Sequence, residues 1–162
     1  MKRSAVWCQM NEFLEEAVGE LKRADHMIYV SLKYTRTVDV IKNILERLIS
    51  CFDFTFEYLV WYLKETKKID ESPAARAKKI EVLKRYFQNS AEFNDYIDFY
   101  LLMRKIDQAN FTRRQEFRRH VTMSAILENN RIVELNIDSI HDYYDKTKAF
   151  VDFAINYSKP KE

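Results

Sequence analysis

The sequence predicts a mainly α fold, an antiparallel helical bundle of about five helices with one β-hairpin before the last helix. Apolar residues recur three or four positions apart along most of the 162 residues, which is the spacing of one helix face. A single glycine, Gly19, and two prolines, Pro73 and Pro160, leave few sites for sharp turns. Only residues 116–138 alternate with the two-residue period of strands. The length and the 47% hydrophobic composition predict a single helical domain over residues 1–162.

Two long helices are expected in the first part of the chain. The first covers about residues 11–34 and has one apolar stripe, which consists of Phe13, Ala17, Leu21, Ala24, Ile28 and Leu32. The second covers about residues 38–67, after a break at residues 35–37, and Thr37 is its expected N-cap. Apolar residues lie on two sides of this second helix, so we expect it to be the central helix of the bundle.

Two shorter helices are expected next. A third helix is predicted to begin at Ser72 and Pro73 and to end at about Phe87, because serine is a good N-cap and proline suits the first helical position. A fourth is predicted to begin near Asn89, which forms a capping-box pattern with Glu92. Its helical pattern weakens after about Asp107.

A β-hairpin is expected over about residues 117–137. With residues 128–130 as a three-residue loop, the strand pairing places six apolar residues on one face, namely Val121, Met123, Ala125, Val133, Leu135 and Ile137. Asparagine at the end of the loop suits the left-handed backbone that such loops commonly need. The final helix is predicted over about residues 139–157, with Asp138 or Ser139 as its cap.

Composition and motifs exclude or disfavour several classes of protein. Cys8 and Cys51 lack metal-ligand spacing and are expected to be free thiols of a cytoplasmic protein. No stretch approaches the roughly 18 apolar residues of a membrane span, and the N-terminus lacks a signal-peptide pattern, so no membrane partner is expected. Glycine-rich phosphate loops and nucleophile elbows need glycines that this chain lacks. The net charge of +2 predicts nucleic-acid binding only where basic residues cluster locally.

A basic segment between residues 104 and 119 is the main candidate for binding. Six basic residues there face only two acidic ones, and arginine offers planar paired donors to phosphate. The candidate nucleic-acid contacts are Arg104, Arg113, Arg118 and Arg119. The alternative is a solvated connector whose arginines pair with acids on neighbouring helices. Phe111 and Phe117 in the same segment either stack on bases or anchor the core.

His120 is the candidate for acid/base chemistry, because histidine titrates near neutral pH. The predicted hairpin register places it opposite Asp138, which would fix its tautomer. The alternative is an exposed strand histidine with no catalytic role. A magnesium site is a weaker interpretation, since Asp53 and Glu57 lie one helical turn apart but ordinary salt bridges explain them more simply. We therefore expect neither a metal nor another cofactor.

The spacing of arginine and histidine in this segment resembles that of HEPN-domain proteins. Five residues separate Arg114 from His120, and six separate Arg113 from it. HEPN proteins are compact cytoplasmic helical bundles that often dimerise, and many cleave RNA without metal through an Arg and a His with roughly four to six residues between them. The order of two long helices, shorter ones, the Arg/His segment and an aromatic-rich final helix extends the resemblance over most of the chain. The resemblance implies that Arg114 and His120 are catalytic and that RNA is the substrate.

Two functions remain open at this point. One is an RNA-directed protein, which either cleaves RNA without metal or only binds it. The other is a non-enzymatic, homodimeric helical module that binds proteins through its aromatic-rich helices. Ten tyrosines and eleven phenylalanines are difficult to bury within one bundle of this length, so a homo-oligomer is expected in either case.

Overall fold

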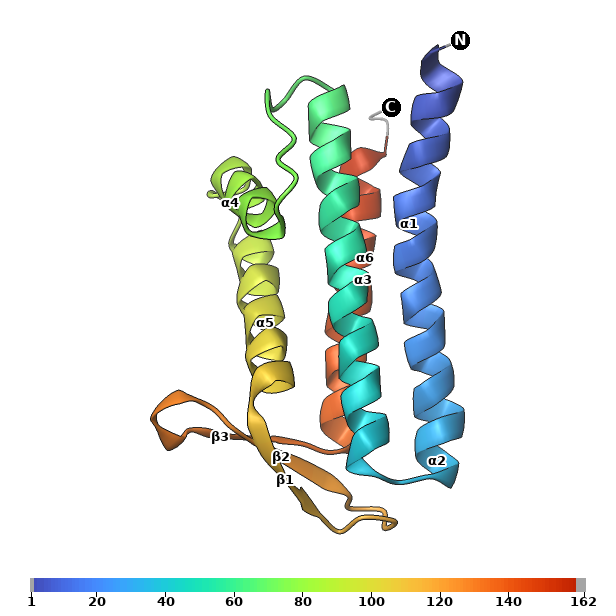
Figure 1. Ribbon diagram of the computed structural model, residues 1–162. Coiled ribbons are helices and arrows are strands. Elements are labelled where there is room, and N and C mark those ends of the chain that lie inside the picture. The colour runs from blue at the N-terminus through green and yellow to red at the C-terminus, as the bar shows by residue number, and fades with distance from the viewer. Residues whose placement is uncertain (1, 160–162) are drawn as a thin grey trace.

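The computed structural model describes the backbone of residues 2–159 and the side chains of residues 12–159. Within these residues it has the predicted mainly α fold, with five helices and a small antiparallel sheet before the last helix (Figure 1). The first helix consists of α1 (Lys2–His26), a π-helical turn (Met27–Ser31) and α2 (Leu32–Tyr34). The other helices are α3 (Val38–Glu65), α4 (Arg76–Tyr86), α5 (Ala91–Gln108) and α6 (Ile137–Ser158). The strands are β1 (Asn110–Arg114), β2 (Thr122–Ile126) and β3 (Ile132–Leu135), in this order across the sheet.

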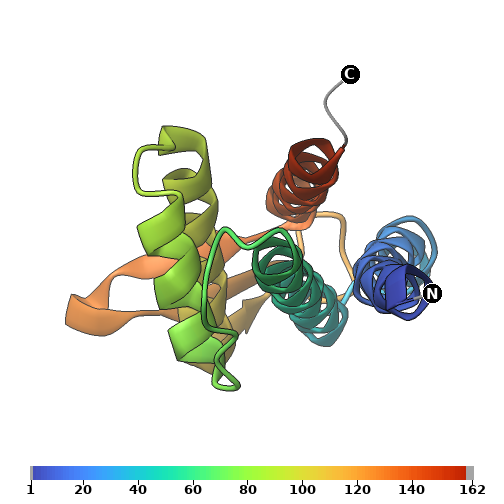
Figure 2. The ribbon, with the colours of Figure 1, turned by 90° about the horizontal axis from the view of Figure 1, so that it is seen from above.

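The central helix is α3, as the apolar residues on two of its sides predict. It packs against α1, α4, α5 and α6. Seen from above, α3 lies between α1 on one side and the pair α4 and α5 on the other (Figure 2). Its most deeply buried side chains include Ile41, Ile44, Leu45, Leu48, Cys51, Phe52, Phe56, Tyr58, Leu59 and Leu63. None of the described helices has an apolar stretch long enough to cross a membrane.

Aromatic rings from three helices meet in the core. Phe52 of α3 stacks on Phe150 of α6 with 4.6 Å between ring centroids. Phe56 of α3 meets Tyr100 of α5 edge to face at 4.9 Å. All four side chains are buried, and such pairs add about 0.5–1.5 kcal/mol each beyond the burial of their area. These contacts hold α5 and α6 on two sides of α3.

The break between the first two helices lies where the sequence predicts it. The chain leaves the helix at residues 35–37, and the Thr37 hydroxyl accepts the N–H of Val40 at 3.3 Å, which confirms the predicted N-cap. The first helix begins at Lys2 instead of near Asn11. Residues 2–11 contain no glycine or proline that would end the helix there.

The two shorter helices, α4 and α5, begin a few residues from their predicted starts. The first of them, α4, begins at Arg76 instead of Ser72. Its first deeply buried side chain is Ile80, and a short helix in water depends on such packing more than on its cap. In α5, Ser90 is the N-cap in place of the neighbouring Asn89, and its hydroxyl accepts a backbone N–H of the first turn at 3.1 Å.

The predicted hairpin is formed by β2 and β3, and its register is confirmed. Met123 lies opposite Leu135, and Ala125 lies opposite Val133. Both asparagines of the connecting loop have a φ of 60°, in the left-handed region that asparagine tolerates better than most residues. The apolar face of β2 is buried against the bundle, because Met123 and Ala125 are fully inaccessible to solvent.

The hairpin is shorter than the predicted range 117–137. Its last strand ends at Leu135, because Asn136, instead of the predicted Asp138 or Ser139, caps α6 through its side-chain oxygen and the helix begins at Ile137. His120 lies in the loop before β2 and has no partner across the hairpin. The predicted strand position of His120 is therefore wrong, since the N-terminal cap of α6 ends the pairing first.

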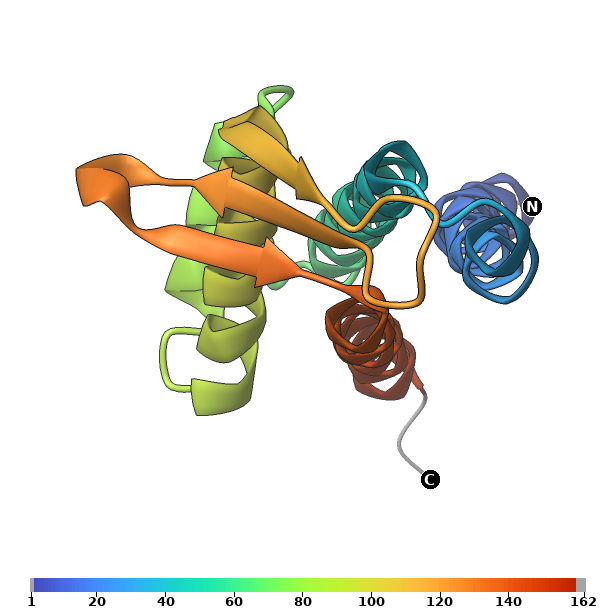
Figure 3. The ribbon, with the colours of Figure 1, turned by 90° about the horizontal axis from the view of Figure 1, so that it is seen from below.

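A third strand, β1, adds to the hairpin and was not expected from the sequence. It runs antiparallel to β2, with Phe111 opposite Ala125 and Arg114 opposite Thr122. Only Phe111 among its side chains is partly buried, so no apolar alternation marks the strand in the sequence. From below, the sheet crosses the lower end of α5, and the loop from β1 to β2 reaches the ends of α2, α3 and α6 (Figure 3).

Candidate nucleic-acid interface

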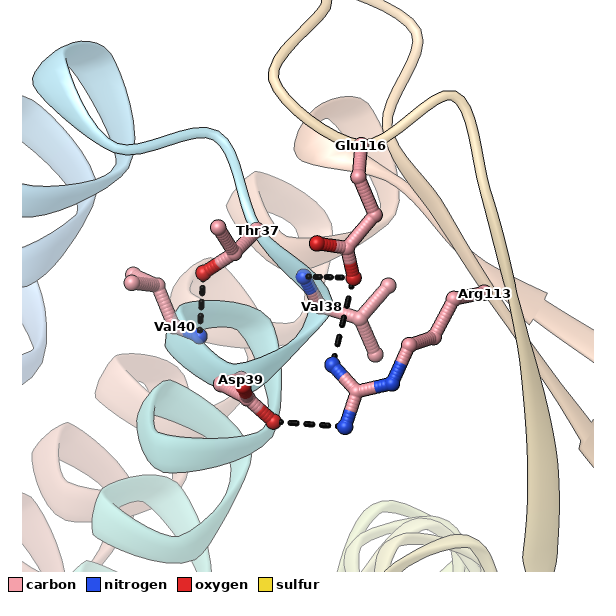
Figure 4. A network of polar contacts seen from close by, with 6 residues as sticks. All are labelled: Thr37, Val38, Asp39, Val40, Arg113 and Glu116. Carbon is pink, nitrogen blue, oxygen red and sulfur yellow. Dashed lines mark hydrogen bonds and ion pairs between the residues drawn. The ribbon is translucent and has the colours of Figure 1, made fainter.

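The loop that joins β1 to β2, residues 115–121, is tied to the start of α3 by one carboxylate. Glu116 Oε1 accepts the backbone N–H of Val38 at 3.3 Å and Nη1 of Arg113 at 3.1 Å (Figure 4). Arg113 Nη2 also donates to Asp39 Oδ1 at 2.8 Å. Glu116 thus satisfies one of the free N–H groups at the start of α3, where a negative charge is favoured. This network fixes the loop on the lower end of the bundle.

The same network changes the acidity of its exposed members. The hydrogen bond from Arg113 lowers the pKa of Asp39 below its ordinary value of 3.8. The hydrogen bonds to Asp39 and Glu116 raise the pKa of the Arg113 guanidinium. Each shift favours the charged form, so these groups remain an ion pair at neutral pH. The charge of Arg113 is therefore neutralised by acids of the same chain. For this arginine the alternative holds in which the basic segment pairs with acids on neighbouring elements.

Phe117 is the most unusual residue of the 115–121 loop. Its backbone has a φ of 66°, a left-handed conformation that is strained for a bulky side chain, and Gln115 two residues earlier has a φ of 53°. The N–H of Phe117 donates to the carbonyl oxygen of Arg36 at 2.6 Å, which holds this backbone in place. The phenyl ring is 74% exposed, so it is not a core anchor. The fold holds an aromatic ring in water at a backbone position that disfavours it.

Three further residues of the loop carry exposed side chains with hydrogen-bond donors. Arg118, Arg119 and His120 are all exposed. Neither arginine forms an ion pair with any acid in the part of the chain that the structure describes. Their positive charges are therefore available to a ligand, next to the exposed ring of Phe117.

A small pocket lies between this loop and the start of α6, and we call it the α6 pocket. It has a volume of about 250 Å³ and is lined by Arg119, His120, Thr122, Asn136, Ile137 and Asp138. His120 and Asp138 thus line one pocket although they are not paired strand residues. The Thr122 hydroxyl donates to the carbonyl oxygen of His120 at 2.8 Å. The Asn136 side chain is occupied as the cap of α6.

The remaining candidate residues do not join this site. Arg104 lies on α5, where its guanidinium carbon is 6.0 Å from the centroid of the Tyr100 ring. Arg114, at the end of β1, forms an ion pair with Glu134 of β3. Neither of them lines the α6 pocket. Of the six arginines and histidines predicted as site residues, the structure gathers Arg118, Arg119 and His120 on the loop.

Two exposed tyrosines of the first helix were not predicted as site residues. Tyr34 is 80% exposed at the end of α2, two residues before the carbonyl that holds Phe117. Tyr29 is also exposed, in the π-helical turn, and its ring meets that of His141 on α6 edge to face at 5.6 Å. The sequence contains a signal for both, since neither tyrosine falls on the apolar stripe of the first helix. An aromatic residue outside such a stripe is a candidate for a surface contact.

The acids considered for magnesium are engaged with protein groups. Asp53 accepts the Tyr100 hydroxyl at 2.6 Å and lies 3.4 Å from Arg76. Burial raises the pKa of Asp53, and the hydrogen bond from Tyr100 opposes that rise. Glu57 pairs with Lys79. No group of three or more histidine, cysteine or acidic side chains suited to a metal is found among the residues with described side chains.

Comparison of the chain with protein-family models, with curated proteins and with solved structures finds no match. The functional assignment therefore depends on the geometry of the 115–121 loop and the α6 pocket.

Proposed function

We propose that this protein binds single-stranded RNA through the 115–121 loop. The observation that carries the proposal is the exposed ring of Phe117 beside Arg118 and Arg119, on a loop that is fixed by its backbone. Proteins that hold single strands combine aromatic rings, on which bases stack, with cationic groups along the backbone path. A rigid loop favours binding, because little conformational freedom is lost when the strand is captured.

The arrangement favours a single strand over a duplex. A base can stack on Phe117 only if it is unstacked from its neighbours, and bases in loops and single strands are free to do so. The exposed Tyr34 lies near the same loop and offers a second ring. Arg118 and Arg119 are the loop arginines without an ion pair among the described residues, so a short contact of a few nucleotides fits this surface best.

Binding is tested by the affinity for a fluorescent twelve-nucleotide RNA at two salt concentrations. Arg118→Ala is expected to weaken binding. It should also reduce the slope of log affinity against log salt concentration by about one, because each phosphate contact releases a counterion. Phe117→Ala is expected to weaken binding by roughly 5- to 150-fold without changing the salt dependence, which is the range for loss of a stacked base. Arg85→Ala is the matched control, because Arg85 is an exposed arginine on α4. No binding by the wild type at low salt would contradict the proposal.

Cleavage of the bound RNA is the further step that the resemblance to HEPN domains implies. In this proposal His120 acts as the general acid/base and Arg114 stabilises negative charge on the phosphate. His120 lies next to Arg119 in the α6 pocket, whereas Arg114 would have to leave its ion pair with Glu134 to take part.

Cleavage is measured in the presence of EDTA, so that any contaminating metal-dependent nuclease is inactive. His120→Ala is expected to abolish cleavage while binding stays nearly intact, because the imidazole transfers protons and adds little affinity. His26→Ala is the control, because His26 is an exposed histidine on α1. Cleavage that persists in His120→Ala would leave an RNA-binding protein without this catalytic mechanism.

The second candidate function is a homodimeric interaction module, and one surface favours it. Leu101, Ile126 and Ile132 are exposed, and we call them the hairpin patch. Ile126 and Ile132 lie opposite each other on β2 and β3, and Ile126 and Leu101 line one pocket of about 670 Å³. Exposed aliphatic side chains around a hollow are typical of protein contacts. A separate prediction below tests this surface.

A further inference from the structure

We infer that the α6 pocket selects a guanine base from the bound strand. The inference rests on the proposed RNA binding and adds a base preference to it. The pocket lies beside the 115–121 loop, because Arg119 and His120 belong to both. Arg119 is two residues after Phe117 in the chain, so in this inference a nucleotide next to the one stacked on Phe117 enters the pocket.

The pocket leaves three side chains free for a ligand. Asn136 Oδ1 accepts the N–H and the hydroxyl of Ser139, and the Thr122 hydroxyl donates to a backbone carbonyl, so these two side chains offer a ligand only the Asn136 amide N–H groups and the lone pairs of the Thr122 oxygen. Asp138, Arg119 and His120 have no side-chain hydrogen bond or ion pair to other residues with described side chains. The side chains that are wholly free are thus a carboxylate that only accepts, a guanidinium that only donates, and an imidazole.

Guanine is the base whose edges fit this set of groups. Its N1–H and N2–H₂ groups are adjacent donors and can bind both oxygens of the Asp138 carboxylate. Its O6 and N7 are acceptors, which arginine recognises with two parallel hydrogen bonds. Adenine and cytosine each present one amino group beside a ring acceptor, and uracil presents one N–H between two carbonyls. On guanine both oxygens of the carboxylate accept a hydrogen bond. On each of the other three bases only one oxygen does so, because the second oxygen faces the lone pair of an acceptor.

The size and charge of the pocket agree with a single base. Its volume of about 250 Å³ is below the range of roughly 300–1,000 Å³ that holds drug-sized ligands. A phosphate is a poorer occupant, because the exposed carboxylate of Asp138 would repel it. The positive charge of Arg119 is balanced by this carboxylate, which suits a neutral base that carries both donors and acceptors.

The test compares four eleven-nucleotide RNAs that consist of uridines with G, A, C or U at the central position. Wild-type protein is expected to bind the G-containing RNA about tenfold more tightly than the all-uridine RNA, as for one well-placed pair of hydrogen bonds. Asp138→Asn is expected to lose this preference and to bind the all-uridine RNA at least as tightly as the wild type, because the change removes a negative charge that repels phosphate. Asp142→Asn is the matched control, because Asp142 is an exposed acid one turn further along α6. Its preference for G should equal that of the wild type.

The possible outcomes separate this inference from the proposed RNA binding. Equal affinity of the wild type for all four RNAs would overturn the guanine pocket and leave RNA binding intact. A preference for G that survives in Asp138→Asn would overturn the role of Asp138, provided that thermal melting shows the variant folded. Failure to bind any of the four RNAs at low salt would overturn both the pocket and the proposed function.

Discussion

At the scale of single residues, Phe117 shows a conflict between local preference and tertiary structure. A left-handed backbone costs an ordinary residue about 1–2 kcal/mol, and an exposed ring gains little from burial in return. The hydrogen bond from its N–H to Arg36 and the anchoring of neighbouring Glu116 hold the strained position. Strained residues are frequent where a side chain contacts a ligand, and the proposed stacking on Phe117 agrees with this.

Phe117→Gly is expected to raise the free energy of unfolding by about 1 kcal/mol, because glycine adopts a positive φ without a steric penalty. Phe117→Ala should give no such gain, since alanine keeps the Cβ atom that causes the strain. Urea denaturation measures both variants. Both should bind RNA more weakly, so stability and binding would change in opposite directions for the glycine variant. A loss of stability in Phe117→Gly would show that the ring contributes packing energy.

Burial determines how reactive the Cys51 thiol is. Its side chain is fully inaccessible and is a free thiol, as predicted. Burial raises the pKa of the Cys51 thiol from 9.0 to about 12. The side chain of Cys8, for which the same was predicted, lies outside the described side chains. A thiol that is buried and protonated at pH 8 cannot attack a disulfide reagent.

In the Cys8→Ser variant, Ellman's reagent at pH 8 is therefore expected to leave Cys51 unmodified while the protein is folded. Unfolding in guanidinium chloride should release one reactive thiol per chain within the mixing time. Rapid modification of the folded variant would mean that the middle of α3 opens readily to solvent.

At the scale of elements, the start of α3 carries two anchors of different origin. The Thr37 cap is local, since donor and acceptor are three residues apart. The Glu116 anchor joins residues that are 78 positions apart and ties the loop to the helix. Arg113 and Asp39 extend this anchor, and their charges make it sensitive to acid.

The pH dependence of this anchor follows from the pKa of Asp39. Because the folded-state pKa lies below 3.8, the pair contributes stability above pH 3.8 and loses it as the pH falls through the lower, folded value. An NMR titration of the Asp39 carboxyl carbon should show this low pKa in the wild type. Arg113→Gln is expected to return it to the ordinary range. Lys42→Gln is the control, because Lys42 is the weakest of the causes that lower this pKa. An unchanged pKa in Arg113→Gln would contradict the arrangement.

At the scale of the whole molecule, the bundle buries its aromatic side chains better than their number suggests. Rings pack on one another, as Phe87 does on Phe93 with centroids 4.5 Å apart. Among the described residues, the large exposed aromatic side chains are Tyr29, Tyr34 and Phe117. The aromatic content by itself therefore gives little support to the expected homo-oligomer, and the aliphatic hairpin patch becomes the better reason for it.

Light scattering at micromolar concentration is expected to give twice the chain mass of 19.6 kDa. Ile132→Glu should reduce the mass to that of one chain, because Ile132 is 61% exposed in the hairpin patch and a charge there would be buried in the dimer. Tyr34→Glu is the control on the other exposed surface and should remain dimeric. If Tyr34→Glu dissociates the protein and Ile132→Glu does not, the surface around Tyr34 is the interface. A wild-type mass of one chain would contradict the dimer itself.

Local patterns in the sequence predict the presence and order of the helices, the break before α3 and the register of the hairpin. Each depends on residues close together in the chain: the three- and four-residue spacing of apolar side chains, the Thr37 cap, and the alternation that pairs Met123 with Leu135. The start of α4 differs from its predicted position, because packing of residues such as Ile80 outweighs a nearby cap.

Which of the predicted site residues share a surface depends on contacts between distant parts of the chain. Arg113 and Arg118 look alike in the sequence, but the first is paired with acids and the second is free of ion pairs among the described residues. Phe117 looks like a core residue and lies in water, because a carbonyl 81 positions earlier holds its backbone. The α6 pocket likewise joins the loop before β2 to the start of α6. Such contacts depend on distances in space between segments that are distant in the chain, and no local pattern records them.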